Sequence, residues 1–379
     1  MTIAVNTRLL LKGKLEGIGW FSYESLKRIT QNNPDVKFLF IFDRKFSDEF
    51  IFSDNIQPII LPPPTRHPLL WYAWLEYSIP YILRKHKPDL FFSPDGFMSL
   101  STKTPTLSVI HDINFAHNPQ DLPERVANYY NKYFPQFAQK STRLATVSEY
   151  SKQDICKTYN ILPEKVDVVY NGINKIYEPL SQEIKTQTKQ KYTEGNDYFV
   201  FVGALSPRKN VARLLQAFDE FVKTTHSNYK MVIVGDKLFM NNDLNAVYNS
   251  MTYKNKVVFT GRLSPEDLKC VLGSAKALTF VPYFEGFGIP IVEAMACNIP
   301  VISSNVTSMP EVAGDAALFV NPYSVDEIKE AMIKLSLSES LCKSLIEKSK
   351  IQQQKFSWDK TAEKLWNSMQ KTIEISKNA

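Results

Sequence analysis

Short apolar runs alternate along the whole chain with longer amphipathic segments. The short runs are typical of buried parallel strands, and the longer segments are typical of the helices that connect such strands. In the first half, this pattern predicts strands at residues 2–6, 37–42, 56–61, 89–93, 106–111, 143–147 and 167–170. In the second half, it predicts strands at residues 198–202, 230–234, 257–260, 277–281 and 300–303. The alternation predicts an α/β protein built from two Rossmann-like domains with parallel sheets.

A polar stretch rich in lysine and glutamine, residues 174–196, separates the two halves. We interpret it as a linker followed by a first helix, which gives an N-terminal domain over residues 1–175 and a C-terminal domain over 176–357. The chain of 379 residues is long enough for two separate cores. Its tail, from Trp358 to about Ile375, has the spacing of an amphipathic helix.

One segment, residues 69–87, is aromatic at its start and basic at its end. Aromatic and cationic side chains together favour a helix at a membrane surface. A helix of the core is the alternative, because Leu70, Trp74, Tyr77 and Tyr81 recur at the spacing of a buried face. We favour the core helix.

Net charge is +6 and it is spread evenly, with 21 Lys+Arg against 18 Asp+Glu in residues 1–180 and 24 against 21 in the remainder. Neither half is basic enough to indicate nucleic-acid binding, whereas a phosphate-bearing ligand or weak contact with an anionic membrane fits. The chain shows no secretion signal and no apolar stretch long enough to span a membrane. We therefore expect a cytoplasmic protein, with reduced thiols at Cys156, Cys270, Cys297 and Cys342.

The most informative stretch is residues 282–296, which follow the predicted strand 277–281. Gly286 and Gly288 indicate a tight turn, and Pro290 suits the first turn of a helix. The free backbone N–H groups at such a helix start attract phosphate.

Two carboxylates, Glu285 and Glu293, bracket this turn, and their separation indicates that they serve different parts of one ligand. Carboxylates accept hydrogen bonds from hydroxyl groups. We therefore expect Glu285 to bind sugar hydroxyls and Glu293 to bind ribose hydroxyls. The alternative is a pair of glutamates with no ligand, one near the helix cap and one in solvent.

A second candidate stretch begins with Gly203, at the end of the predicted strand 198–202. Arg208 and Lys209 follow, where we expect the next helix to open. Cations at a helix amino terminus are disfavoured by about 0.3–1 kcal/mol, and a bound diphosphate would reverse this cost. Gly261 and Arg262 follow another strand end.

The first half offers fewer candidates. Gly17 and Gly19 lie in a glycine-bearing loop that leads into a helix from about Ile18 to Thr30, although two glycines alone are a weak phosphate signal. His111 ends a predicted strand, at the sheet edge where ligands bind in such proteins. Ser148 is explained as the N-cap of the helix that runs to Tyr159.

The stretch from Glu285 to Ala296 resembles the E-x7-E signature of family-four retaining glycosyltransferases, which have the GT-B fold. Residues 202–210, 258–263 and 310–317 fall in the order and spacing of that family. In the first half the resemblance rests on the Gly17–Gly19 loop, His111-Asp112, residues 146–148 and residues 169–173. The second half, which would bind the donor, matches more densely than the first.

This resemblance implies two facing Rossmann-like domains, with the tail helix crossing back to the first. It implies that Arg208 and Lys209 hold the donor diphosphate, that residues Gly261 and Arg262 border the base, and that His111 lies beside the donor sugar. The implied catalytic residues are His111, Arg208, Lys209 and Glu285. The implied donor-binding residues are Gly17, Gly19, Gly203, Arg208, Lys209, Gly261, Arg262, Glu285, Gly286, Phe287, Gly288, Ile289 and Glu293.

The implied reaction is transfer of a hexose, with retained configuration, from a nucleotide-diphosphate sugar to a hydroxyl of a glycan or lipid-linked acceptor. Similarity to bacterial mannosyltransferases of polysaccharide assembly implies GDP-mannose as the donor. No D-x-D motif occurs, so we expect no metal and no cofactor. One departure is Ala204, where many relatives carry arginine after the glycine.

Three other function classes compete with this one. A nicotinamide oxidoreductase would need a complete G-x-G-x-x-G motif, and the sequence after Gly19 lacks the third glycine. A sugar-nucleotide epimerase of GT-B shape would release nucleotide without an acceptor. A non-catalytic binding subunit would not need the full set of charged candidates.

Overall fold

The structure is a computed structural model, and it describes residues 1–236 and 242–377. The chain forms two compact units, one of Met1–Gly172 with Ser357–Ala379 and one of Ile173–Phe356. We call them unit 1 and unit 2. The last two residues of the expected returning segment, 358–379, and residues 237–241 of the expected second domain lie outside the described part of the chain.

Unit 1 is built on a seven-stranded sheet in the order β3-β2-β1-β4-β5-β6-β7, and each pair of neighbours is parallel. Its central strands are almost wholly buried, as expected for a sheet covered by helices on both faces. The strands are β1 (Thr2–Asn6), β2 (Lys37–Phe42), β3 (Ile56–Ile60), β4 (Leu90–Ser93), β5 (Thr106–Val109), β6 (Arg143–Thr146) and β7 (Val166–Val168).

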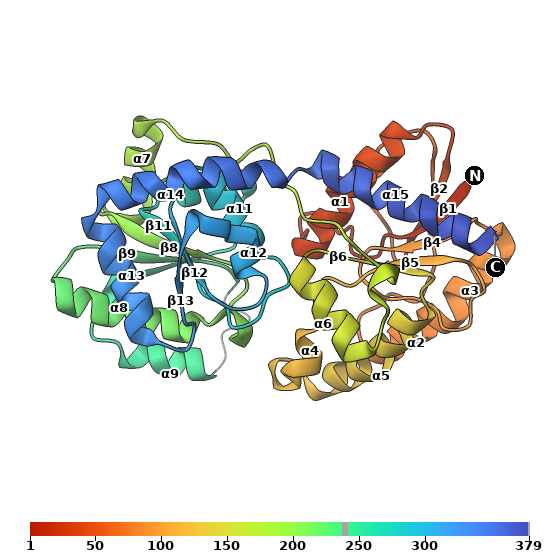
Figure 1. Cartoon of the computed structure of the whole chain (residues 1–379), viewed down its shortest axis with the longest axis horizontal. Helices are drawn as coiled ribbons and strands as arrows, with labels where there is room; N and C mark the ends of the chain where they lie inside the picture. The colour runs from red at the N-terminus through yellow and green to blue at the C-terminus, as the bar shows by residue number, and fades with distance from the viewer. Residues whose placement is uncertain (237–241, 378–379) are drawn as a thin grey trace. The chain divides into compact units, whose positions relative to one another are not determined.

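The helices of unit 1 include the tail of the chain. They are α1 (Gly17–Asn32), α2 (Pro68–Ala73), α3 (Ile79–His86), α4 (Asn114–His117), α5 (Glu124–Lys140), α6 (Glu149–Tyr159) and α15 (Trp358–Lys377). The tail helix α15 packs against α1 and against β4, β5 and β6 (Figure 1). The prediction that this helix returns to the first domain is therefore confirmed.

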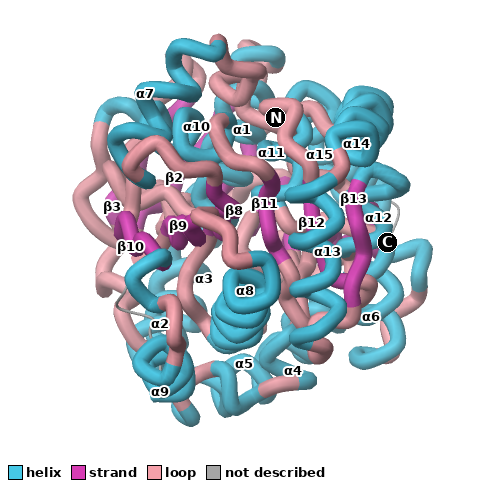
Figure 2. Tube along the Cα trace, turned by 90° about the vertical axis from the view of Figure 1, so that its left-hand side faces the viewer, coloured by secondary structure: helices cyan, strands magenta, loops and turns pink. Residues whose placement is uncertain are grey.

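Unit 2 contains a six-stranded parallel sheet, whose strands appear in the order β10-β9-β8-β11-β12-β13 across Figure 2. The strands are β8 (Tyr198–Val202), β9 (Lys230–Val234), β10 (Val257–Gly261), β11 (Ala277–Phe280), β12 (Val301–Ser304) and β13 (Ala317–Val320). The helices are α7 (Gln182–Thr193), α8 (Val211–Thr225), α9 (Asn242–Ser250), α10 (Pro265–Gly273), α11 (Ile289–Ala296), α12 (Met309–Ala313), α13 (Val325–Leu337) and α14 (Glu339–Gln352).

The two sheets confirm the predicted fold class, with small differences. Strand β13 was not predicted. It is only four residues long, two of its residues are buried, and it pairs with β12 at the edge of the sheet. Strand β5 ends at Val109, so His111 lies in the loop after the strand and not in it. Gly17 and Gly19 belong to the first turn of α1, and the prediction that they form a loop is wrong.

The aromatic segment also departs from the prediction. Trp74 is fully buried, but Tyr77 and Tyr81 are 69% and 57% exposed, so they do not belong to a core face. A π-helix, Trp74–Ser78, joins α2 to α3 and shifts the register of the residues that follow it.

None of the helices in the described residues combines the length and the apolar character needed to cross a bilayer. The four cysteines are free thiols.

Candidate functional site

The loop between β11 and α11 has the predicted form. Gly288 is the N-cap of α11 and has φ +89°, a conformation that favours glycine, and Pro290 follows in the first turn. A Cβ at Gly288 would also lie 2.9 Å from the Cε atom of Met309. Phe287 is buried and packs edge-on against Phe356, with ring centroids 5.4 Å apart. This packing holds the loop so that the amino end of α11 follows the carboxyl end of β11.

Arg208, Lys209 and Glu285 form one charge cluster. The Arg208 guanidinium donates to Glu285 Oε2 at 2.8 Å, and the Lys209 ammonium donates to the same oxygen. The Lys209 ammonium also lies 4.7 Å from the centroid of the Phe280 ring. Burial by itself raises the pKa of Glu285, but the two cations outweigh it and hold the pKa below its usual value. Glu285 is therefore a carboxylate at neutral pH.

The backbone around this cluster differs from the prediction. Arg208 and Lys209 lie in a 3-10 turn, Pro207–Lys209, and do not open helix α8, which begins at Val211. Asn210 has a left-handed backbone, with φ +62°, and separates the turn from the helix. Arg208 and Lys209 are therefore outside α8, where the unfavourable interaction of cations with the helix dipole is weaker.

Neighbouring side chains that the sequence analysis missed hold this turn against the β11–α11 loop. Asn210 Nδ2 donates to the carbonyl oxygens of Val281 and Pro322 at 3.0 and 2.7 Å. The Tyr283 N–H donates to the Arg208 carbonyl at 3.0 Å, and the Ser308 hydroxyl donates to the Glu285 carbonyl at 2.8 Å. These are contacts between distant segments, and no local motif signals them.

Three glycines join the carboxyl ends of β8, β9 and β10. The Gly203 N–H donates to the Val234 carbonyl at 2.9 Å, and the Gly235 N–H donates to the Gly261 carbonyl at 3.1 Å. A Cβ at Gly235 would lie only 2.0 Å from the Gly203 oxygen, so this position requires glycine. Gly203 and Gly261 are candidate residues from the sequence, whereas Gly235 is not. The exposed Arg262 follows Gly261 directly.

Glu293 lies in the second turn of α11 and belongs to a different set of contacts from Glu285. Tyr177, which is buried, donates a hydrogen bond to the Glu293 carboxylate. Burial raises the pKa of Glu293 to about 8, although the tyrosine hydrogen bond opposes the shift. The two glutamates of the signature thus differ in charge state near neutral pH, and Tyr177 is a neighbour that the sequence did not indicate.

This difference predicts a pH-dependent stability. The pKa of Glu293 is about 8 in the folded chain against an ordinary 4.5, so the folded state binds the proton more tightly. The stabilisation is fully present below pH 4.5 and is lost as the pH rises through 8. We expect the free energy of unfolding of the wild type to fall between these pH values relative to Glu293→Gln, by at most about 1.4 kcal/mol per pH unit.

Denaturant unfolding of both proteins at a series of pH values measures this difference. Tyr177→Phe is a useful companion, because its hydrogen bond lowers the pKa of folded Glu293, so its loss should leave the start of the fall unchanged and extend the fall to higher pH. If the free energy of unfolding changed with pH in the same way for the wild type and for Glu293→Gln, the raised pKa of folded Glu293 would be contradicted.

In unit 1, His111 is held by the backbone. Its Nε2 lies 2.9 Å from the Pro94 carbonyl oxygen, which can only accept, so Nε2 carries the proton. Burial lowers the pKa of His111 more than the Pro94 carbonyl and the nearby Asp112 and Asp95 raise it. The ring is therefore neutral at pH 7, with Nδ1 as an acceptor.

The amino-terminal part of helix α1 packs against this histidine through Phe21. The Phe21 ring packs edge-on against the His111 imidazole, with ring centroids 4.9 Å apart. Gly17 and Gly19 lie in the turn that precedes Phe21. A Cβ at Gly19 would lie 3.1 Å from Leu15 Cδ2 and 3.3 Å from the Leu9 carbonyl oxygen, so the helix start packs closely on the loop before it.

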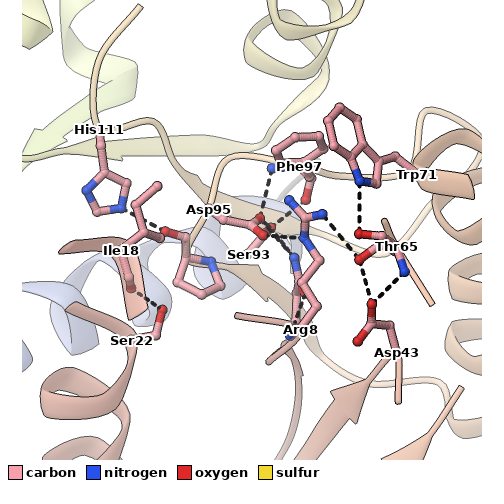
Figure 3. A network of polar contacts seen from close by, with 12 residues as sticks. Arg8, Ile18, Ser22, Asp43, Thr65, Trp71, Ser93, Asp95, Phe97 and His111 are labelled. Atoms are coloured by element: carbon pink, nitrogen blue, oxygen red, sulfur yellow. Dashed lines mark hydrogen bonds and ion pairs between the residues drawn. The ribbon is translucent and has the colours of Figure 1, made fainter. Parts of the chain in front are cut away.

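A buried polar network extends along the same sheet edge, and the sequence analysis missed it. Figure 3 shows Arg8 between Asp95 and Thr65, and its Nε donates to Asp95 Oδ2 at 2.6 Å. The guanidinium also lies 4.1 Å from the centroid of the Phe97 ring. Thr65 donates from its hydroxyl and its N–H to Asp43 Oδ2, at 2.6 Å in each case. The network ties together the segments that follow β1, β2, β3 and β4.

Within the described ranges, no group of three histidine, cysteine or acidic side chains is placed so that it could hold a metal ion.

Two family profiles match the chain. The profile described as "Glycosyltransferase Family 4" matches residues 16–175, and the profile described as "Glycosyl transferases group 1" matches residues 182–352.

Individual proteins agree with these profiles. The chain is 26% identical to O-antigen chain mannosyltransferase B of Escherichia coli, over 92% of this chain and 94% of that protein. It is 31% identical to O-antigen chain mannosyltransferase RfbU of Salmonella typhimurium, over 67% of each.

The solved structure of Anabaena HepE in complex with UDP and glucose superimposes with a TM-score of 0.74, covering 98% of this chain and 100% of that chain at 18% identity. At this identity the likeness concerns the fold. Together with the two parallel sheets and the profile matches, it shows that the chain belongs to the family-four glycosyltransferases of the GT-B fold and is a glycosyltransferase.

Proposed function

We propose that this glycosyltransferase transfers a mannosyl residue from GDP-mannose to a hydroxyl of a glycan or lipid-linked glycan during polysaccharide assembly, with retained configuration and without a metal ion. The names of the two mannosyltransferase relatives support the sugar and the kind of product. A lipid-linked acceptor would place the reaction at the cytoplasmic face of a membrane.

The single observation that carries the proposal is the charge cluster of Arg208, Lys209 and Glu285. A departing nucleoside diphosphate gains negative charge as the glycosidic bond breaks, and fixed cations stabilise that charge most where water is excluded. The Lys209 side chain is 11% exposed and is held between Glu285 and the Phe280 ring, so it needs little reorganisation. Arg208 and Lys209 would share the diphosphate between them.

Glu285 would have a role that suits a permanent carboxylate. Because its pKa is held low, it cannot donate a proton at neutral pH, but it can accept hydrogen bonds from sugar hydroxyls and stabilise positive charge on the ring. We assign the acceptor's proton to the leaving phosphate oxygen, so that no basic side chain is needed to take it.

The other donor contacts would follow the two ends of the nucleotide sugar. Backbone N–H groups from Gly286 to Ile289 would meet the phosphate at the start of α11, and Glu293 would accept from the ribose hydroxyls. The backbone at Gly203, Gly261 and Arg262 would border the nucleotide. In unit 1, His111 would accept a hydroxyl hydrogen bond at Nδ1, beside the helix start that carries Gly17 and Gly19.

The experiment is a transfer assay with a panel of nucleotide sugars, each run with and without EDTA, with glycan and lipid-linked acceptors. We expect GDP-mannose to give a mannosylated product with retained configuration, and the rate to survive EDTA because the proposed diphosphate partners are side-chain cations and helix N–H groups.

Three outcomes would contradict this proposal. Transfer from another nucleotide sugar alone would refute mannose, and activity that EDTA abolishes and metal restores would refute the metal-free mechanism. Release of free nucleotide from the donor without any acceptor would favour the epimerase. Thermal-shift measurements on the same panel show which nucleotides bind, since a ligand at a hundredfold excess over Kd stabilises the fold by about 2.7 kcal/mol.

A further inference from the structure

Large apolar side chains lie in one exposed row along the helical segment from α2 to α3. Leu69 is 71% exposed and Tyr72 is 37% exposed, and they are followed by Tyr77 and Tyr81. The exposed cations Arg84 and Lys85 continue the row in the last turn of α3. We call these six residues the docking face. It lies in unit 1 and includes none of the residues assigned above to the donor.

The π-helix is what aligns this row. An α-helix would bring position 76, four residues after Tyr72, to the same face. The wider turn of Trp74–Ser78 contains one more residue, so Tyr77 takes that place instead of Glu76. The ring centroids of Tyr72 and Tyr77 are 6.3 Å apart, and the Glu76 carboxylate accepts instead from the Leu100 N–H at 2.7 Å. The π-helix therefore keeps an acidic side chain out of the row.

Helix α5, which packs against α2, extends the face with further residues of the same kinds. The Tyr133 ring lies 5.9 Å from that of Tyr72, centroid to centroid. The Lys132 ammonium lies 5.1 Å from the Tyr133 ring centroid, and Lys132 is exposed. Aromatic rings beside cations thus come from two helices.

The charge of the segment is one-sided. Residues 66–87 contain the four cations Arg66, Arg84, Lys85 and Lys87 and the single acid Glu76, which gives this segment a net charge of +3. Cations in the last turn also stabilise the helix through its dipole, but that effect gives no reason to expose a leucine and three tyrosines in line with them. A binding partner with an apolar interior and an anionic surface would account for both the exposed apolar side chains and the positive charge.

We propose that the docking face binds unit 1 to an anionic lipid bilayer surface. Leu69 and the tyrosine rings would enter the interface between headgroups and acyl chains, where aromatic rings with a polar edge are favoured. Arg84 and Lys85 would meet the lipid phosphates. Unit 1 binds through these six side chains, whatever sugar the enzyme transfers.

The test is sedimentation of the full chain with vesicles, without nucleotide sugar. We expect binding to vesicles of phosphatidylcholine mixed with phosphatidylglycerol, much weaker binding to phosphatidylcholine alone, and a decrease at high salt. Each cation near an anionic surface changes binding about fivefold, so Arg84→Glu with Lys85→Glu should weaken it at least about 25-fold. Tyr77→Ser with Tyr81→Ser should also abolish most of the binding.

Matched controls come from α13 and α14 in unit 2. Leu337 and Ile351 are 79% and 71% exposed, and Lys343 and Lys348 are exposed as well. Leu337→Ser with Ile351→Ser, and Lys343→Glu with Lys348→Glu, make the same changes of polarity and charge away from the docking face. We expect both to bind vesicles like the wild type, and circular dichroism to show that all four variants are folded.

The proposal is overturned if the wild type does not bind the anionic vesicles, or if the docking-face and control variants bind equally. It is also overturned if light scattering shows a wild-type dimer that Tyr77→Ser with Tyr81→Ser converts to a monomer, because the face would then be covered by a second copy. Since no sugar is transferred in this assay, its result is independent of the proposed donor and acceptor.

Discussion

Lys209→Ala is expected to lower kcat/KM at least about 100-fold, because it removes a fixed cation aimed at charge that develops on the leaving diphosphate. Affinity for the free nucleoside diphosphate should fall as well. The side chain is paired with Glu285 and mostly buried, so its loss should also cost some stability, in contrast to an exposed surface lysine.

Steady-state kinetics with saturating acceptor and calorimetric titration of nucleoside diphosphate measure both effects. Lys329→Ala is the matched control, because Lys329 also has a mostly buried side chain in unit 2 and pairs with Asp326. A double-mutant cycle that combines Lys209→Ala with Glu285→Gln should show strong coupling, since the Lys209 ammonium donates directly to a Glu285 carboxylate oxygen. Donor affinity and turnover at the wild-type level in Lys209→Ala would remove the basis of the proposed function.

Gly172→Ala is expected to destabilise unit 1 by about 3 kcal/mol and to release the start of α15. A Cβ at Gly172 would lie 2.2 Å from the Trp358 nitrogen and 2.7 Å from the Ser357 carbonyl carbon. Backbone atoms cannot move aside as the end of a side chain can. The Thr361 hydroxyl also donates to the Tyr170 carbonyl at 2.7 Å, so a hydrogen bond joins the two segments next to this close contact.

The consequences should reach the candidate site of unit 1. The Trp358 ring packs edge-on against Phe21, whose ring in turn packs against His111. Thermal unfolding and limited proteolysis of the tail measure the effect, and Gly19→Ala serves as the control because the flexible Leu15 side chain is the nearest obstacle there. If Gly172→Ala kept the melting temperature and the proteolysis pattern of the wild type, the close packing of Gly172 on the start of α15 would not contribute to stability, which would contradict this prediction.

Much of the fold could be predicted from the sequence because its signals are local. Buried parallel strands read as short apolar runs, and the predicted ranges 2–6, 37–42, 198–202 and 230–234 agree with the strands observed. The turn before α11 has a left-handed residue at Gly288 and a proline, Pro290, in the first turn of the helix, and both residue types are visible in the sequence. The amphipathic spacing of the tail likewise identified α15.

Contacts between distant segments had to come from the tertiary structure. Glu285 meets Lys209 and Arg208 across 76 and 77 residues of chain, so their pairing cannot be read from the spacing of either motif. The same holds for Tyr177 and Glu293, which lie on different segments of unit 2. The opposite pKa shifts of the two glutamates follow from these neighbours and from burial, and therefore depend on packing.

Residues 69–87 show the boundary between the two kinds of information. Their composition alone indicated both a membrane-surface helix and a core helix, and the regular α-helical spacing favoured the core. The π-helix changes that spacing by one residue, which turns Tyr77 and Tyr81 outward and Glu76 toward Leu100. A helical pattern in a sequence assumes a constant number of residues per turn, and a π-helix breaks that assumption. The two sheets and the side chains available for chemistry could therefore be predicted from local patterns, whereas the contacts and the solvent exposure of those side chains depend on tertiary packing.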